Sequence, residues 1–191
     1  SFDQMKAAYK AQAEALAKGG ADLFLIETCF DALNVKAALS AISELSPLPV
    51  MVSVSVGDRS GRTMTGQTLE AFYHSVCHYP LLSFGLNCSL GASELMPLIE
   101  EIGSWCRCRV SCYPNAGLPN EMGGYDQSPD DMASQIRVMA EKGLLDIVGG
   151  CCGTTPSHIK AIAKALNGIS PKPRAGHDEH KTLTVSGLEA V

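Results

Sequence analysis

Hydrophobic and polar positions along the chain follow two alternating patterns. In one, apolar residues recur near every 3.6 positions, as Met5, Ala8 and Ala11 do, which predicts amphipathic helices. In the other, a short run such as residues 22–27 (DLFLIE) is almost continuously apolar and predicts a strand buried on both faces. The helices expected are 3–18 with Asp3 as its N-cap, 31–44, 68–78, 91–103, 128–143 and 154–166, and the strands expected are 22–27, 48–56, 81–87, 108–114 and 144–150.

The strict alternation of strands and helices predicts an α/β fold, in which helices cover a parallel sheet. An eight-stranded (β/α) barrel typically takes about 250 residues, whereas this chain has 191. It is therefore either a smaller open sheet or a barrel whose first strands are missing. No GxGxxG or GxxxxGK(S/T) turn is present, which weakens the nucleotide-binding open sheet and favours the partial barrel. We expect a domain at 1–168 and a Pro-containing linker at 169–191.

The amino-acid composition argues against some classes of function. With 46% hydrophobic and 18% charged residues, the chain has enough apolar side chain for one buried core. A net charge of −5 without a basic run argues against nucleic-acid or membrane-surface binding and favours a small-molecule partner. No apolar stretch approaches the ~20 residues of a membrane span, and the first residues are helical in character, so we expect a cytoplasmic protein. Its eight cysteines are then expected to be reduced thiols, some of them metal ligands.

Three thiols follow the ends of expected strands. Cys88 comes directly after the strand that ends at Asn87, and Cys151 and Cys152 follow the last strand. Because the carboxyl ends of parallel strands meet on one face of the fold, these thiols are expected on the same rim.

Cys151 and Cys152 are adjacent, and adjacent strand residues point to opposite faces, so the backbone must turn sharply for both to meet one ion. Thr155 is the expected N-cap of the last helix, with Pro156 at its first position, which would place amide N–H groups near both sulfurs and favour thiolates. Glycines supply the freedom for the turn: Gly149, Gly150 and Gly153.

Three thiolates suit zinc, which catalytic sites often hold with three protein ligands, leaving the fourth position to substrate or water. The sequence therefore predicts an open zinc site formed by Cys88, Cys151 and Cys152. The alternative is that these are ordinary buried cysteines, since no CxxC pair is present. The surrounding glycines and the shared position at strand ends favour the metal site.

Five cysteines and five histidines are expected to have no ligand role. Cys29 and Cys77 lie on or near expected helices, and Cys106, Cys108 and Cys112 share a core-facing strand parity. No ligand-spaced histidine pair lies near a thiol motif, and His158 is expected at the surface; the histidines are His74, His78, His158, His177 and His180.

Two polar residues stand at the same rim. Glu27 ends an apolar strand, where its carboxylate could bind the ammonium group of an amino-acid substrate or simply be solvated. Asn115, within YPNAGLPN, could offer an amide oxygen to metal or substrate, or act only as a turn former. The polar, glycine-rich loop 57–67 is expected to line the mouth of the site.

The segments GLNCSLGASEL, YPNAGLPN and GGCCGTTPSHI closely resemble the homocysteine-binding domain of cobalamin-dependent methionine synthase. The resemblance covers nearly the whole chain, and the separated Cys followed by Cys-Cys is specific to homocysteine S-methyltransferases as a group. It implies a (β/α)8 barrel, of which the five expected strands match strands 4–8. The first three strands of that barrel, with their DGAMGT-like segment and part of the homocysteine pocket, have no counterpart here.

The resemblance also implies roles for individual residues. Zinc would be held by Cys88, Cys151 and Cys152, with the homocysteine sulfur as incoming fourth ligand. Three residues fall in the substrate pocket, where Glu27 contacts the amino group and Asn115 lies near the metal; they are Glu27, Asn87 and Asn115. The methyl donor implied is methylcobalamin on another domain, and the tail TLTVSGLEAV resembles the linker to a folate-binding domain. The cobalamin-binding and folate-binding domains of the same enzyme are therefore the expected partners.

Other functions are compatible with the same residues. The donor could be betaine or S-methylmethionine, as in relatives of methionine synthase. The three cysteines could instead close a non-catalytic zinc or thiol-redox module with a fourth protein ligand. A third reading is an inactive remnant of a split or truncated gene.

Overall fold

The structure is a computed structural model that describes residues 1–171 and 184–191. Five strands form one parallel sheet in the order β1-β2-β3-β4-β5, and helices alternate with them, which confirms the predicted α/β fold. The strands are β1 (Phe24–Cys29), β2 (Val50–Val54), β3 (Leu81–Gly91), β4 (Arg109–Asn115) and β5 (Ile147–Val148). The helices are α1 (Phe2–Lys18), α2 (Ala32–Leu45), α3 (Leu69–Val76), α4 (Ala92–Trp105), α5 (Pro129–Glu141) and α6 (Pro156–Ala165).

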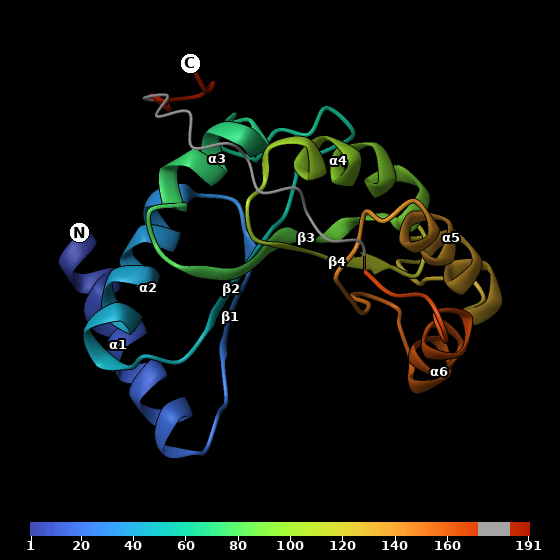
Figure 1. The fold of residues 1–191 in the computed structure, drawn as a ribbon, viewed down its shortest axis with the longest axis horizontal. Helices are drawn as coiled ribbons and strands as arrows, with labels where there is room; N and C mark the ends of the chain where they lie inside the picture. Colours follow the sequence, from blue (N-terminus) through green and yellow to red (C-terminus); the bar gives the residue numbers. More distant parts are fainter. Residues whose placement is uncertain (172–183) are drawn as a thin grey trace.

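The sheet is the inner layer of an arch, and the helices cover its outer side (Figure 1). Alternate strand residues such as Val52 and Phe84 are fully buried in the core between the sheet and the helices. The intervening positions, which point to the other face, carry small polar residues such as Ser53 and Ser83, also fully buried. This period of two therefore separates an apolar helix-facing side from a polar inner side.

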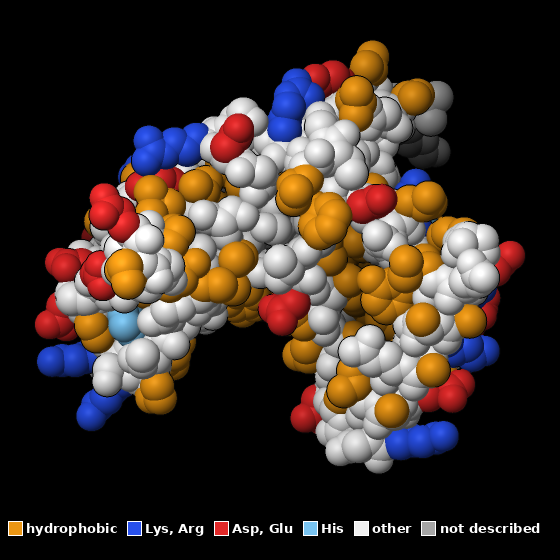
Figure 2. All heavy atoms as spheres, turned by 180° about the vertical axis from the view of Figure 1, so that it is seen from behind, with side chains coloured by type: hydrophobic (Ala, Val, Ile, Leu, Met, Phe, Trp, Pro, Cys, Tyr) orange, Lys and Arg blue, Asp and Glu red, His pale blue; other side chains and the backbone are white. Residues whose placement is uncertain are grey.

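The inner side of the arch is hollowed between its two limbs (Figure 2). Within the described residues β1 pairs with β2 alone, so the sheet is not closed. Leu23 and Leu25 are each 39% exposed, and the prediction that residues 22–27 are buried on both faces is therefore wrong. An edge strand has one neighbour, and its inward side chains are not covered by a facing strand.

Several element boundaries differ from those predicted. Ser1, not Asp3, is the N-cap of α1, because its hydroxyl accepts the N–H of Gln4. The predicted strand 144–150 shortens to Ile147–Val148. Its backbone nevertheless continues beside β4, since the N–H of Cys151 donates to the carbonyl oxygen of Pro114 at 2.7 Å. This extension carries the cysteines to the carboxyl end of β4.

Residues 184–191 fold back onto the outer side of the arch. The N–H of Thr68 donates to the carbonyl oxygen of Leu188 at 2.9 Å, and the Gln67 side chain donates to that of Gly187 at 2.8 Å. Much of the predicted linker 169–191 lies outside the described residues. Among the described helices, none is both long and apolar enough to cross a membrane.

Candidate metal centre

Three thiols meet at the carboxyl ends of the strands. The Sγ atoms of Cys88, Cys151 and Cys152 all lie within 4.8 Å of one another, and those of Cys88 and Cys152 are 3.6 Å apart. Cys88 and Cys151 are half-buried, whereas Cys152 is exposed. The structure thus brings together the three residues predicted as metal ligands, from positions 64 residues apart in sequence.

Cys88 reaches the cluster through an unusual backbone conformation. It lies inside β3, not after it, yet both Cys88 (φ 63°) and Ser89 (φ 62°) are left-handed, and the pairing with β4 shifts between Asn87 and Gly91. Such a conformation is unfavourable for residues with a side chain. The hydroxyl groups of Ser55 and Ser89, 2.7 Å apart, help to hold it.

Backbone hydrogen bonds to the end of β4 fix the Cys151–Cys152 segment. The N–H of Cys152 donates to Oδ1 of Asn115 at 3.1 Å, and its carbonyl oxygen accepts the N–H of Ala116 at 2.9 Å. Gly153 has φ +77°, and a Cβ there would come within 2.3 Å of the Cβ of Tyr125. The predicted glycine-dependent turn is therefore real, and Asn115 acts on it through the backbone of Cys152.

Asn87 connects three strands to the thiol cluster. Its Oδ1 accepts the N–H of Thr28 at 3.0 Å and the hydroxyl of Ser53 at 2.7 Å. Its Nδ2 donates to Oγ1 of Thr28 at 2.8 Å and lies 3.8 Å from Sγ of Cys151. Asn87 is 1% exposed, so this network orients the side chain toward Cys151 rather than toward solvent.

Protonation of Cys151 differs from the sequence-based expectation. Burial raises the pKa of Cys151 to about 11, and the neighbouring thiols of Cys88 and Cys152 add to the rise, while the hydrogen bond from Asn87 opposes it. Thr155 and Pro156 do begin α6 as predicted. The net pKa of Cys151 is nevertheless raised, so the expected preference for a thiolate is wrong for this residue; a cation among the sulfurs would lower its pKa.

The loop before α5 covers one side of the cluster. Desolvation raises the pKa of Tyr125, and its hydrogen bond with Cys152 contributes to the same rise. His158 in α6 is only 6% exposed, so its expected surface location is wrong. Its Nδ1 accepts the N–H of Thr155 at 3.2 Å, so Nε2 carries the proton and donates to the carbonyl oxygen of Gln127 at 2.9 Å. His158 thereby ties this loop to α6.

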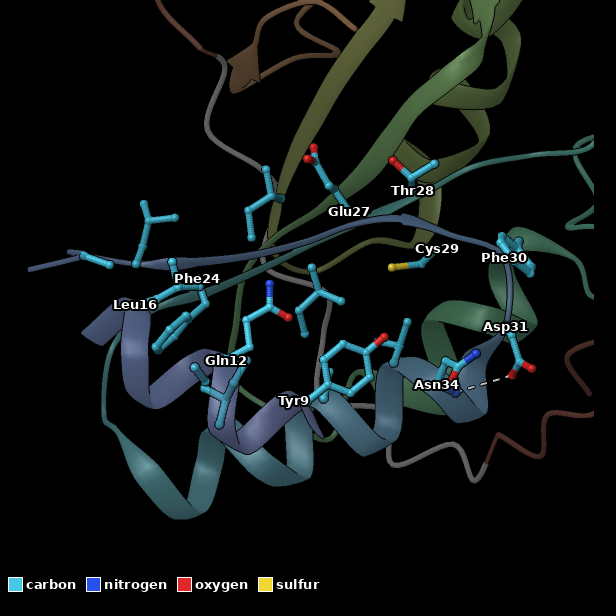
Figure 3. A pocket seen from close by; sticks show the side chains of 18 residues that line it. Tyr9, Gln12, Leu16, Phe24, Glu27, Thr28, Cys29, Phe30, Asp31 and Asn34 are labelled. Carbon is cyan, nitrogen blue, oxygen red and sulfur yellow. Dashed lines mark hydrogen bonds between the residues drawn. The ribbon is translucent and has the colours of Figure 1, made fainter. Parts of the chain in front are cut away.

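Glu27 lies on β1, at the open side of the arch. It is exposed and lines a cavity of about 510 Å³ along the β1 edge. Glu27 and Thr28 point to one side of the strand, whereas Cys29 and Tyr9 lie on the other (Figure 3). The negative charge of Glu27 is one cause of the raised pKa of Tyr113 on β4, although burial of the phenol is the larger one. Glu27 therefore faces the inner side of the sheet.

The remaining cysteines and histidines lie away from the cluster. Cys112 is fully buried in the core as predicted, and Cys29, at the end of β1, lies two residues before the N-cap of α2. His177 and His180 lie outside the described residues.

The donor set suits a tetrahedral zinc ion. With Zn–S bonds of about 2.3 Å, two sulfurs of a tetrahedron are about 3.8 Å apart, close to the 3.6 Å between Cys88 and Cys152. Within the described part of the chain, no other His, Cys, Asp or Glu joins this group at metal-ligand distance. The three thiols therefore leave one tetrahedral position for another molecule.

Comparison with known proteins connects this geometry to a family. A family model described as homocysteine S-methyltransferase matches residues 1–166. This chain belongs to the homocysteine S-methyltransferase family. The resemblance seen in its cysteine motifs is thereby confirmed at the level of the family.

Solved structures of the homocysteine methyltransferase MmuM from Escherichia coli share the fold of this chain. The apo form has a TM-score of 0.67 and 22% identity, covering 86% of this chain and 57% of MmuM. The oxidized form has 0.69 and 21%, covering 83% and 52%, and the metallated form 0.67 and 22%, covering 86% and 52%. The chain thus spans slightly more than half the length of these structures. Their likeness confirms the predicted fold, five β/α units arranged as part of a (β/α)8 barrel.

Sequence reasoning missed several residues that position the candidate metal centre. Thr28 and Ser53 hold Asn87, and Tyr125 packs beside Cys152. Ser53 interrupts the apolar run VMVSVSV at an inward position, which is a signal that could have been used. Nothing local in the sequence indicates that Tyr125 meets a cysteine 27 residues further on.

Proposed function

We propose that this chain binds zinc through Cys88, Cys151 and Cys152 and presents homocysteine for methylation at its sulfur, giving methionine. The observation that carries the proposal is the cluster of three thiols with one tetrahedral position left over. A thiolate substrate suits that position, because zinc favours sulfur ligands. Family membership supports homocysteine as the substrate.

Zinc, when bound, stabilises the thiolate form of a coordinated sulfur, which is otherwise mostly protonated at neutral pH. The residues of the chain itself prepare the site. Asn87 donates toward Cys151, and Asn115 fixes the backbone of Cys152. Because these contacts are already formed, little rearrangement is needed when the metal ligands come together.

Glu27 supplies the proposed recognition of the amino acid. Its carboxylate is exposed on the inner side of the arch, one residue before Thr28, whose N–H contacts Asn87. An ammonium group is the natural partner for a carboxylate at this place. Asn87 has all its polar atoms engaged by the protein, so we assign it to positioning and not to direct substrate contact.

The methyl donor we propose is methylcobalamin carried by another domain, on the strength of the motif resemblance to methionine synthase. Residues 169–191 would then lead toward a folate-binding domain of the same enzyme. Betaine and S-methylmethionine are the competing donors. Reduced thiols at the metal centre suit a reducing compartment such as the cytoplasm.

The test is zinc X-ray absorption with and without homocysteine. We expect the zinc-loaded chain to show three sulfurs and one nitrogen or oxygen neighbour, and to gain a fourth sulfur when homocysteine is added. Homoserine, which has a hydroxyl in place of the thiol, is the matched control and should leave three sulfurs. An unchanged shell with homocysteine would instead indicate a structural zinc site.

A single-turnover assay separates the donors. The zinc-loaded chain is given homocysteine with methylcobalamin, S-methylmethionine or betaine, and methionine is measured. Because the chain spans only part of the MmuM structures, the same assay is run with a longer chain that includes the neighbouring domains. Methionine formed from S-methylmethionine but not from methylcobalamin would overturn the donor proposed here.

A further inference from the structure

A second group of thiols lies at the opposite end of the sheet from the metal centre. Cys106 is the C-cap of α4, and Cys108 directly precedes β4. Their Sγ atoms are 3.5 Å apart. The seven-residue β4 begins next to this pair and ends at Asn115, beside the metal centre, a span of about 20 Å at ~3.3 Å per residue. The two groups of thiols are therefore distinct sites.

The two sulfurs are arranged for a bond with each other. Residues at i and i+2 of an extended segment point to the same side, and the ψ of 129° at Cys106 is extended. A disulfide requires the sulfurs to approach to about 2.05 Å. The two sulfurs, 3.5 Å apart, therefore have a further ~1.5 Å to close before they can bond.

Solvent reaches one member of the pair. Cys108 is half-buried and lines a recess of about 400 Å³ together with His74, Cys77 and Arg107. Cys106 is 2% exposed and lies behind it. A small thiol-reactive molecule would therefore meet Cys108 first.

The cysteines around the recess have different neighbours. Burial raises the pKa of Cys77, and the positive charge of Arg107 opposes this rise. Arg107 thus offsets part of the effect of burial on the thiol of Cys77. Cys77 lies 4.0 Å from Nδ1 of His74, whereas Cys106 and Cys108 have each other's sulfur at 3.5 Å.

We propose that Cys106 and Cys108 form a dithiol site that is oxidised to a disulfide by exchange with a low-molecular-weight disulfide, RSSR. The Cys108 thiolate attacks one sulfur of RSSR, forms a mixed disulfide and releases RS⁻. Cys106, which loses its proton to solvent, then attacks the Cys108 sulfur and releases the second RS⁻. In sum, two protein thiols are oxidised to one disulfide and RSSR is reduced to two RSH.

The sequence between the two cysteines makes the test direct. The protein is incubated with oxidised glutathione, quenched with N-ethylmaleimide and cleaved with trypsin. Cleavage after Arg107 separates residues 63–107 from the dipeptide 108–109. A Cys106–Cys108 disulfide keeps the dipeptide attached, so its mass appears on peptide 63–107. Oxidation of the metal centre between Cys88 and Cys152 would instead join 63–107 to 143–160 and is not mistaken for it.

Three variants assign the bond. In Cys106→Ser the reaction should stop at one glutathionyl group on Cys108, and in Cys108→Ser the dipeptide link should be lost. Cys77→Ser is the matched control, because Cys77 shares the recess and the peptide but should not affect the link. Persistence of a glutathione adduct on Cys108 in the unchanged protein, maleimide labelling of both residues, or loss of the link in Cys77→Ser would each overturn the proposal.

Discussion

The two ends of the sheet both gather cysteines, but in opposite ways. At the carboxyl end, Cys88 and Cys152 come from segments 64 residues apart and depend on left-handed backbone at Cys88. At the amino end, Cys106 and Cys108 are neighbours in sequence and need only an extended backbone. Three thiols from two separate segments are placed so that they could hold an ion with one position open, whereas two thiols separated by a single residue are suited to bond with each other.

The surroundings of the two groups differ as well. Amide groups of Asn87 and Asn115 hold the carboxyl-end cluster in place. Near the amino-end pair, the neighbours are aromatic, and the N–H of Arg107 donates to the hydroxyl of Tyr73 at 3.0 Å. Polar side chains thus orient the sulfurs of the proposed metal site, whereas a recess and aromatic neighbours adjoin the proposed dithiol site.

The largest expected effect is the loss of zinc binding when any one thiol is removed from the carboxyl-end cluster. We expect Cys88→Ala, Cys151→Ala and Cys152→Ala each to lose stoichiometric zinc binding, because two thiolates provide too little charge and too few bonds. Cys108→Ala at the other end should retain one zinc per chain. Metal content after dialysis measures both, and full zinc occupancy in all three cluster variants would disprove the ligand assignment.

Asn87→Leu tests whether a residue that positions a proposed metal ligand affects zinc affinity. It removes the donor to Cys151 and leaves the N–H of Thr28 without its acceptor. We expect zinc affinity to fall roughly 10–100-fold and the free energy of unfolding to fall by about 1–3 kcal/mol. Ser53→Ala is the control, since it loses one hydroxyl of the same network but keeps the contact with Cys151. Competition with a chromophoric chelator measures the affinity, and equal values for both variants would contradict the role of Asn87.

Glu27→Gln should separate substrate recognition from metal binding. Removing the carboxylate charge should weaken homocysteine binding about tenfold, equivalent to about 1.4 kcal/mol, while zinc content stays unchanged. Calorimetry on the zinc-loaded protein provides the measurement. Glu121→Gln, on the exposed loop before α5, is the control. If both variants bind homocysteine as tightly as the unchanged protein, the role of Glu27 must be abandoned.

The smallest expected effect is on the pH dependence of stability, and it concerns Cys112, a core thiol in the middle of β4. Burial raises its pKa from 9.0 to about 12. The unfolded chain therefore loses this proton near pH 9 and the folded chain only near pH 12, so stability present at lower pH is lost as pH rises across this window. The slope for one group is at most about 1.4 kcal/mol per pH unit. Urea unfolding between pH 8 and about 10.5 should show this decline, and Cys112→Ala should make it shallower; an identical slope would contradict the assignment.

Sequence alone determined the elements and the chemistry that they carry. The alternation of apolar runs and 3.6-residue patterns predicted every strand and helix of the described fold. An element that packs against the core must carry apolar residues at its own spacing, and this spacing is visible in the local sequence. Three cysteines placed directly after the ends of expected strands predicted that their thiols meet, because parallel strands end on one rim; Cys88 in fact lies inside the longer β3. The Thr155-Pro156 start of α6 is likewise a local preference that tertiary contacts did not change.

Tertiary structure alone decided what each polar group does. The Asn87 side chain forms hydrogen bonds with β1 and β2 and also contacts Cys151, and Oδ1 of Asn115 accepts the N–H of Cys152. The exposure of Leu25 depends on whether a strand lies beside β1, and the pKa of Cys151 depends on burial and on nearby sulfurs. Hydrogen-bond partners, exposure and charge are properties of neighbours in space, and the partners of Asn87 and Asn115 lie tens of residues away in sequence.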